Sequence, residues 1–192
     1  MGATQLPYKE NLVQECEEVF PGTGERFWKL LSEVHGKFAG LSYESRSWVF
    51  GGPISIQPRP EIDEEDDGPF IDLFDSGSVD RPVGVYLSLT QRVFYGYESQ
   101  GQFSYFPAYP SLFNFLASEA LHAETDRWHS AQGGVVANHE LLADVIESMP
   151  CIREASGVSD WWYGENNTRV YVRNPGAGLT NAGEWEWQKW TR

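Results

Sequence analysis

The sequence predicts an α+β protein: a single domain with a largely antiparallel sheet flanked by helices. Apolar residues recur at helical spacing near the start of the chain and again after residue 111. Between these regions lie short runs of alternating apolar and polar residues, separated by Gly and Pro turns. This order of helices, sheet and helices is typical of α+β folds, and 192 residues can bury one substantial core.

Two amphipathic helices are expected at the N-terminal end. The first spans residues 10–20, with Leu12 and Cys16 on its apolar stripe, and it stops before a Pro-Gly pair. The second spans residues 24–36, and Thr23 stands at the position of its N-cap. The first helix carries Glu15, Glu17 and Glu18 on its opposite face.

The middle of the chain contains six candidate strands. They are residues 47–50, 54–56, 70–74, 83–89, 92–97 and 103–106. Pro107 and Pro110 predict the end of this sheet, because proline cannot donate to a ladder of backbone hydrogen bonds. Ser111 is a good N-cap for a long helix over residues 111–128.

Residues 129–192 are expected to form a C-terminal elaboration on a core of residues 1–128, packed on the same domain. A helix is predicted over residues 139–149, capped by Asn138, and strands over 169–172 and 184–187. Five of the eight Trp residues lie in this part of the chain. Glu184 and Glu186 would share one face of the last strand, with two Trp residues on the other.

The net charge of −14 is concentrated in one short segment. Residues 61–80 contain nine carboxylates and no Lys or Arg, which argues against a protein that binds the phosphate backbone of nucleic acids. Prolines and mutual repulsion predict an exposed acidic loop over residues 58–69. Three interpretations remain open: a solvated insertion, a docking surface for a basic partner, or a calcium loop.

The calcium interpretation has partial support from residue spacing. Asp63, Glu65, Asp67 and Gly68 match the first, third, fifth and sixth places of an EF-hand-like loop. The twelfth place, where a bidentate Glu is required, is Phe74, so a standard EF-hand is rejected while weak cation binding stays open.

Recognised catalytic motifs are absent from the sequence, so we expect no catalytic residues, no metal and no cofactor. His122, Asp126 and His129 would share one face of the helix over 111–128, where they either face solvent or hold a metal. For the Trp residues of the tail, three interpretations stay open. They pack in a core, they form a carbohydrate-binding or carbohydrate-active surface to which Trp161 and Trp162 contribute, or they belong to a protein interface.

Residues 10–125 resemble the SUKH superfamily. The resemblance rests on the segment Ser111-Leu-Phe-Asn-Phe-Leu116 that opens a helix after a sheet, on the two early helices, and on Trp48-Val-Phe-Gly-Gly52. Many bacterial members of this superfamily are immunity proteins, which bind a toxin of the same cell and neutralise it. The resemblance therefore implies a binding protein that occludes the active site of a cognate toxin.

We accordingly expect a cytoplasmic immunity protein with a basic protein partner, and neither a nucleic acid nor a membrane as its target. No apolar run reaches the length of a membrane span, the N-terminus lacks a secretory pattern, and the two cysteines form no CxxC motif. The candidate residues are carboxylates for electrostatic attraction and tyrosines for aromatic contact. They are Glu61, Asp63, Glu64, Glu65, Asp66, Asp67, Tyr95, Tyr97, Tyr105 and Tyr109.

Overall fold

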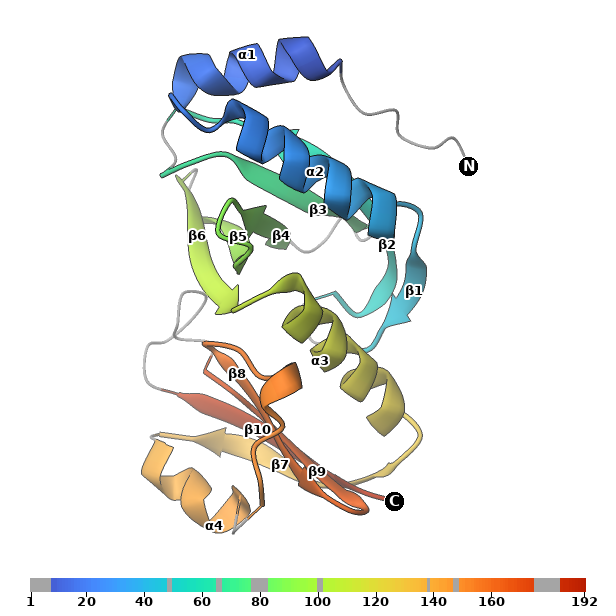
Figure 1. Cartoon of the computed structure of the whole chain (residues 1–192). Helices are drawn as coiled ribbons and strands as arrows, with labels where there is room; N and C mark the ends of the chain where they lie inside the picture. Colours follow the sequence, from blue (N-terminus) through green and yellow to red (C-terminus); the bar gives the residue numbers. More distant parts are fainter. Residues whose placement is uncertain are drawn as a thin grey trace. The chain divides into compact units, whose positions relative to one another are not determined.

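A computed structural model describes residues 8–47, 50–64, 67–76, 83–99, 102–137, 139–146, 149–174 and 184–192. It confirms the α+β class, with one six-stranded and one four-stranded sheet (Figure 1). The chain divides into two compact units, residues 1–103 and residues 104–192. The predicted domain boundary after residue 128 stays a prediction. No helix in the described part of the chain is long and apolar enough to cross a membrane.

The first unit begins with α1 (Lys9–Val19) and α2 (Gly24–Phe38), close to the predicted bounds. Thr23 was expected to cap α2, but its side chain makes no capping bond and donates instead to the carbonyl of Phe20. Glu17 of α1 takes that role, since its carboxylate accepts the backbone N–H groups of Gly22 at 2.6 Å and Gly24 at 2.7 Å. The negative charge of this carboxylate, next to the N-terminus of α2, also interacts favourably with the dipole of that helix.

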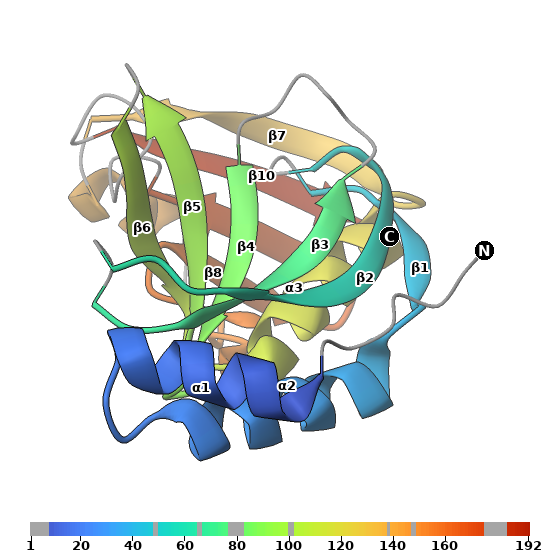
Figure 2. The ribbon, with the colours of Figure 1, turned by 90° about the horizontal axis from the view of Figure 1, so that it is seen from above.

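The six-stranded sheet has the order β1-β2-β3-β4-β5-β6. Figure 2 shows these strands side by side, with α1 and α2 near one end of them. The bounds of the strands are β1 (Ser42–Ser45), β2 (Gly52–Glu61), β3 (Phe70–Ser76), β4 (Val83–Ser88), β5 (Val93–Ser99) and β6 (Gln102–Tyr109). Every strand pair with a described register from β1 to β5 is antiparallel.

Two sequence expectations about this sheet are wrong, and a third is only partly described. Of the strand expected over 47–50, Ser47 and Phe50 are outside any strand and residues 48 and 49 lie outside the described residues, while β1 precedes this segment. The expected loop over 58–69 begins later, because β2 continues to Glu61 through two prolines. β1 pairs only with residues 52–55 of β2. At Pro58 and Pro60, the side of β2 that faces away from β3 therefore has no partner in β1, and a residue without a backbone N–H is tolerated there.

Pro107 does not end the sheet either, because it lies inside β6, the last strand in the order. The second unit continues with α3 (Leu112–Thr125), for which Ser111 is the N-cap as predicted. The Ser111 hydroxyl accepts the Asn114 backbone N–H at 3.2 Å. This bond satisfies one of the backbone donors that an N-terminal turn leaves unpaired.

The second sheet has the order β7-β10-β9-β8 and is antiparallel. Its strands are β7 (His129–Val136), β8 (Asp160–Glu165), β9 (Thr168–Arg173) and β10 (Trp185–Thr191). Neither β7 nor β8 was predicted from the sequence. The helix expected over 139–149 is shorter, consisting of a 3-10 turn η1 (His139–Leu142) and α4 (Ala143–Ile146). Its expected cap, Asn138, lies outside the described residues. A second 3-10 turn is η2 (Arg153–Ala155).

Both cysteines of the chain are free thiols. Cys16 is buried in α1, where its sulfur lies 3.2 Å from the Thr23 hydroxyl, and burial raises the pKa of its thiol. Cys151 is exposed, and its backbone forms an isolated antiparallel β-bridge with the backbone of Tyr163 in β8.

Candidate protein-binding surface

One face of the first unit's sheet carries a group of aromatic side chains. The strand registers pair Phe70 with Ser88, and Tyr86 of β4 with both Asp72 of β3 and Phe94 of β5. Residues that lie directly opposite in an antiparallel pair share a face. The face therefore combines side chains from three consecutive strands, and Phe103 of β6 joins them through its contact with Tyr86.

The four rings pack edge to face. Phe70 and Phe94 have ring centroids 5.4 Å apart, Phe70 and Tyr86 6.3 Å, and Tyr86 and Phe103 5.8 Å, at angles between 73° and 83°. Phe70 is buried, whereas Phe103 is 47% exposed. We call this set of Phe70, Tyr86, Phe94 and Phe103 the aromatic face. Its edge-to-face geometry is the arrangement that aromatic quadrupoles favour.

Two glycines shape the aromatic face. Gly84 and Gly96 lie opposite each other on β4 and β5. A Cβ at Gly96 would lie 2.4 Å from the Tyr86 ring and 2.6 Å from the Phe103 ring. The two rings therefore lie directly over the backbone at Gly96 and occupy the space that the side chain of any other residue would need.

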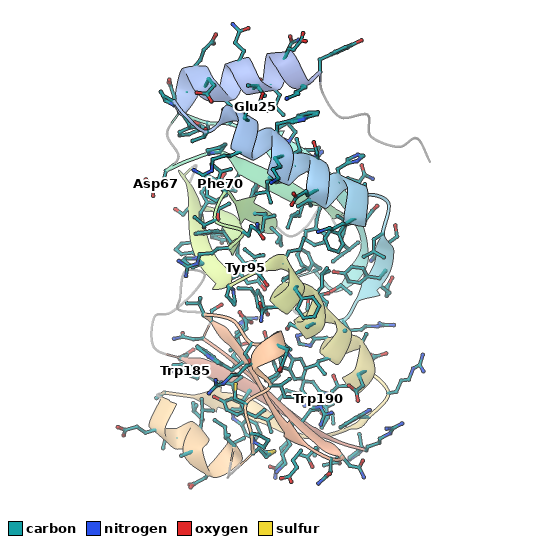
Figure 3. All side chains as sticks on the ribbon, in the orientation of Figure 1. Glu25, Asp67, Phe70, Tyr95, Trp185 and Trp190 are labelled. Carbon is teal, nitrogen blue, oxygen red and sulfur yellow. The ribbon has the colours of Figure 1, made fainter. Side chains whose placement is uncertain are left out.

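The carboxylates begin where the aromatic face ends. Glu61, the last residue of β2, pairs with Phe70, the first residue of β3. Figure 3 shows Asp67 and Phe70 near one another at this end of the sheet. Asp72 also belongs to the face and forms an ion pair with Arg59 at 2.7 Å. Glu61 and Asp72 therefore share this face of the sheet with the aromatic side chains.

Four of the six predicted carboxylates are exposed. Glu61 ends β2, and Asp63, Glu64 and Asp67 lie in the segment between β2 and β3. Glu65 and Asp66 lie outside the described residues. The calcium interpretation depended on Glu65, so the set predicted for that site is not fully described. Within the described ranges, no group of three or more potential ligand residues could hold a metal ion.

Of the four predicted tyrosines, Tyr95 and Tyr109 are buried, and Tyr97 and Tyr105 are half-buried. Tyr95 pairs with the buried Val85 and is itself 5% exposed, so it belongs to the core (Figure 3). Tyr109 is 2% exposed and donates to the Ser118 hydroxyl at 3.0 Å. Tyr97 lies on the same face as Tyr95 and is half-buried, as is Tyr105. The aromatic side chains beside the carboxylates are instead those at alternate positions of β4 and β5.

A buried polar cluster in the second unit is the other concentration of chemistry-bearing side chains. The Ser118 hydroxyl of α3 also accepts the Trp162 indole N–H at 2.9 Å. The hydroxyl of Tyr171 donates to the fully buried carboxylate of Asp160, which also accepts the Ser159 hydroxyl. Each of these groups is bonded to another within the core, and burial further raises the pKa of Tyr171 well above its usual range. The cluster therefore holds α3 against the sheet.

His122 was expected on the solvent face of its helix or in a metal site, and it is in neither place. It is 7% exposed and packs between Trp162 and Tyr171, with both ring centroids 4.7 Å away. The helix ends at Thr125, and His129 lies in β7, so these two histidines do not share a helix face. Desolvation lowers the pKa of His122 to about 4, which keeps its ring neutral at pH 7.

The Trp residues of the tail pack in cores on the two faces of the second sheet. Trp161, Trp185 and Trp187 contact a cluster of Leu142, Val170 and Val172, as the core-packing interpretation predicted. On the opposite face, Trp162 stacks on Trp190 with centroids 5.7 Å apart. Figure 3 shows Trp185 and Trp190 toward the two ends of β10. These contacts weigh against an open carbohydrate-binding platform.

The chain was compared with protein-family models, with curated proteins and with solved structures, and none of the three comparisons found a match.

Proposed function

We propose that this chain is a non-catalytic binding protein of the immunity type, which neutralises a basic toxin by covering its active site. The observation that carries the proposal is the run of exposed carboxylates directly beside the aromatic face in the first unit. Clustered negative charge accelerates capture of a basic partner, and aromatic side chains supply most of the contact energy at protein interfaces.

The distribution of charge and burial supports binding rather than chemistry. The carboxylates Glu61, Asp63, Glu64 and Asp67 are exposed, whereas the polar groups of the second unit's core are buried and bonded to one another. The SUKH resemblance adds the class of partner, a toxin of the same cell. The proposal includes a cytoplasmic location, where such a toxin would have to be neutralised.

A charge-neutralised variant provides the test. Glu61→Gln, Asp63→Asn, Glu64→Gln and Asp67→Asn are combined, and a basic protein recovered from the native host on immobilised wild-type chain is used as the analyte. We expect the variant to associate at least tenfold more slowly at low salt, with the difference shrinking at high salt because the Debye length falls.

The control variant removes the same charge elsewhere in the first unit. Glu10, Glu15, Glu18 and Glu33 are exposed residues of α1 and α2, and changing each to Gln gives the same net charge. This control should retain nearly the wild-type association rate. An equal loss in both variants would mean that only net charge matters, and a rate indifferent to salt in all of them would contradict the proposal.

A further inference from the structure

The two edges of the second unit's sheet differ. β8 forms one edge, and its outer side is bonded to the segment before it: the Ile152 N–H donates to the Trp162 carbonyl at 2.7 Å, and the Gly164 N–H donates to the Pro150 carbonyl at 3.0 Å. Cys151 completes this bridge to the strand. The β8 edge is therefore closed by the protein's own backbone.

β7 forms the opposite edge. Among the residues that the structure describes, it pairs with β10 alone, and Figure 2 shows it at the margin of its sheet. Residues 129–135 are all exposed, and Val135 is 59% exposed. A bulge at Ala131 interrupts the register near the start of the strand, but residues 132–136 pair regularly with β10. A regular stretch of strand thus presents its outer backbone groups.

Apart from the bulge at Ala131, β7 lacks the features that usually protect such an edge. Natural edge strands carry charged residues or proline to prevent pairing with another chain. Residues His129–Val136 contain no Lys, Arg, Asp, Glu or Pro, in a chain whose net charge is −14. The other outer strand, β8, ends with the exposed Glu165.

We infer that β7 is a homotypic docking edge, to which β7 of a second copy adds in the antiparallel direction. The occupant follows from the charge pattern. An uncharged strand offers a basic partner no ion pair, whereas it lets two strongly acidic copies meet without opposing carboxylates along the strand. Antiparallel pairing about a two-fold axis brings the same strand against itself, which is the isologous geometry of most protein dimers.

Association of this kind is weak and has a characteristic dependence on salt. One strand pair buries less than the roughly 1,200 Å² typical of a stable interface, so the dimer forms only at high concentration. Because each copy is acidic, salt screens the repulsion between copies and strengthens the dimer. The opposite salt dependence is expected for capture of a basic partner, so the two proposals fail independently.

The test is sedimentation velocity of the full chain from about 1 µM to about 1 mM at low and high salt, over the range in which a weak strand pair is populated. We expect a monomer that becomes increasingly dimeric with concentration and with salt. Amide hydrogen exchange at residues 132–136 should slow with concentration, because the outer backbone groups become bonded.

Val135→Lys places a charge on the edge and should weaken dimerisation at least tenfold. Phe113→Lys is the matched control, since Phe113 is a 71% exposed apolar residue of α3 and the charge change is identical. It should leave the dimer unchanged. A chain that stays monomeric at about 1 mM, an equal loss in both variants, or β7 amides that become protected only with an added extended peptide would each overturn the inference.

Discussion

The imidazole of His122 packs edge-on against the indole of Trp162, with ring centroids 4.7 Å apart and planes at 71°. Tyr171 contacts the same imidazole at an equal centroid distance. A histidine enclosed by two aromatic rings loses the water that would solvate its charged form. Its position therefore couples the stability of the second unit to pH.

The buried His122 predicts that the free energy of unfolding already decreases at pH values above those at which carboxylates titrate. The pKa of His122 is lowered from 6.5 to about 4 on folding, so the unfolded chain binds the extra proton. Stability is then fully present above pH 6.5 and falls as pH decreases toward 4, by about 1.4 kcal/mol per pH unit. Urea unfolding between pH 7 and pH 5 measures it. His122→Asn should flatten the slope, whereas the exposed control His129→Asn should keep it.

Removing the Ser118 hydroxyl should be costly because two buried donors share it. In Ser118→Ala, the Tyr109 hydroxyl and the Trp162 indole lose this acceptor, and we expect a loss of about 2–3 kcal/mol. Tyr109→Phe removes one of those donors. A double-mutant cycle should give a combined loss smaller than the sum of the two single losses. Strictly additive effects would show that the Tyr109–Ser118 bond contributes nothing.

A methyl group at Gly96 should destabilise the first unit. It would meet the Tyr86 and Phe103 rings at 2.4 Å and 2.6 Å, so Gly96→Ala forces both rings to move, at about 1–3 kcal/mol. Gly36→Ala makes the same substitution within α2, where no heavy atom lies within 4 Å of the new Cβ. That control should be neutral or stabilising by up to about 1 kcal/mol. Chemical denaturation of both variants would reveal the difference, and equal effects would exclude the packing argument.

The N-cap of α3 should be worth about 1 kcal/mol. Ser111→Ala leaves the Asn114 backbone N–H without its side-chain acceptor, and the midpoint of thermal unfolding should fall. Ser111→Asp restores an acceptor and adds a favourable charge at the helix N-terminus, so it should recover most of the loss. A drop in Ser111→Asp as large as in Ser111→Ala would indicate that the bond is not stabilising.

The sequence predicted helices and most strands well because their patterns are strong. A capping serine before an apolar stripe located α3 within a few residues. Which residues of β5 face the core could not be predicted. Phe94 and Tyr95 are adjacent aromatic residues, so the two faces of the strand do not differ in polarity. The candidates taken from β5, Tyr95 and Tyr97, consequently lie on the face opposite to Phe94, and the aromatic face was missed.

The second unit was harder to predict because its elements depend on tertiary pairing. β7 contains a glycine pair and few residues that favour strands, and it forms by pairing with β10, more than 50 residues later. The burial of His122 has the same origin, since the rings that enclose it come from β8 and β9. Neither strand's position relative to α3 is encoded in local spacing.

The contrast between the two cysteines has a practical consequence for measuring the association of copies. Cys16 is enclosed and Cys151 is exposed, so a maleimide reagent should attach to a single site per molecule without any substitution. A nitroxide or fluorophore placed there reports on the second unit. Two associated copies would then carry a symmetric pair of probes, whose separation is measurable by spin–spin coupling or energy transfer.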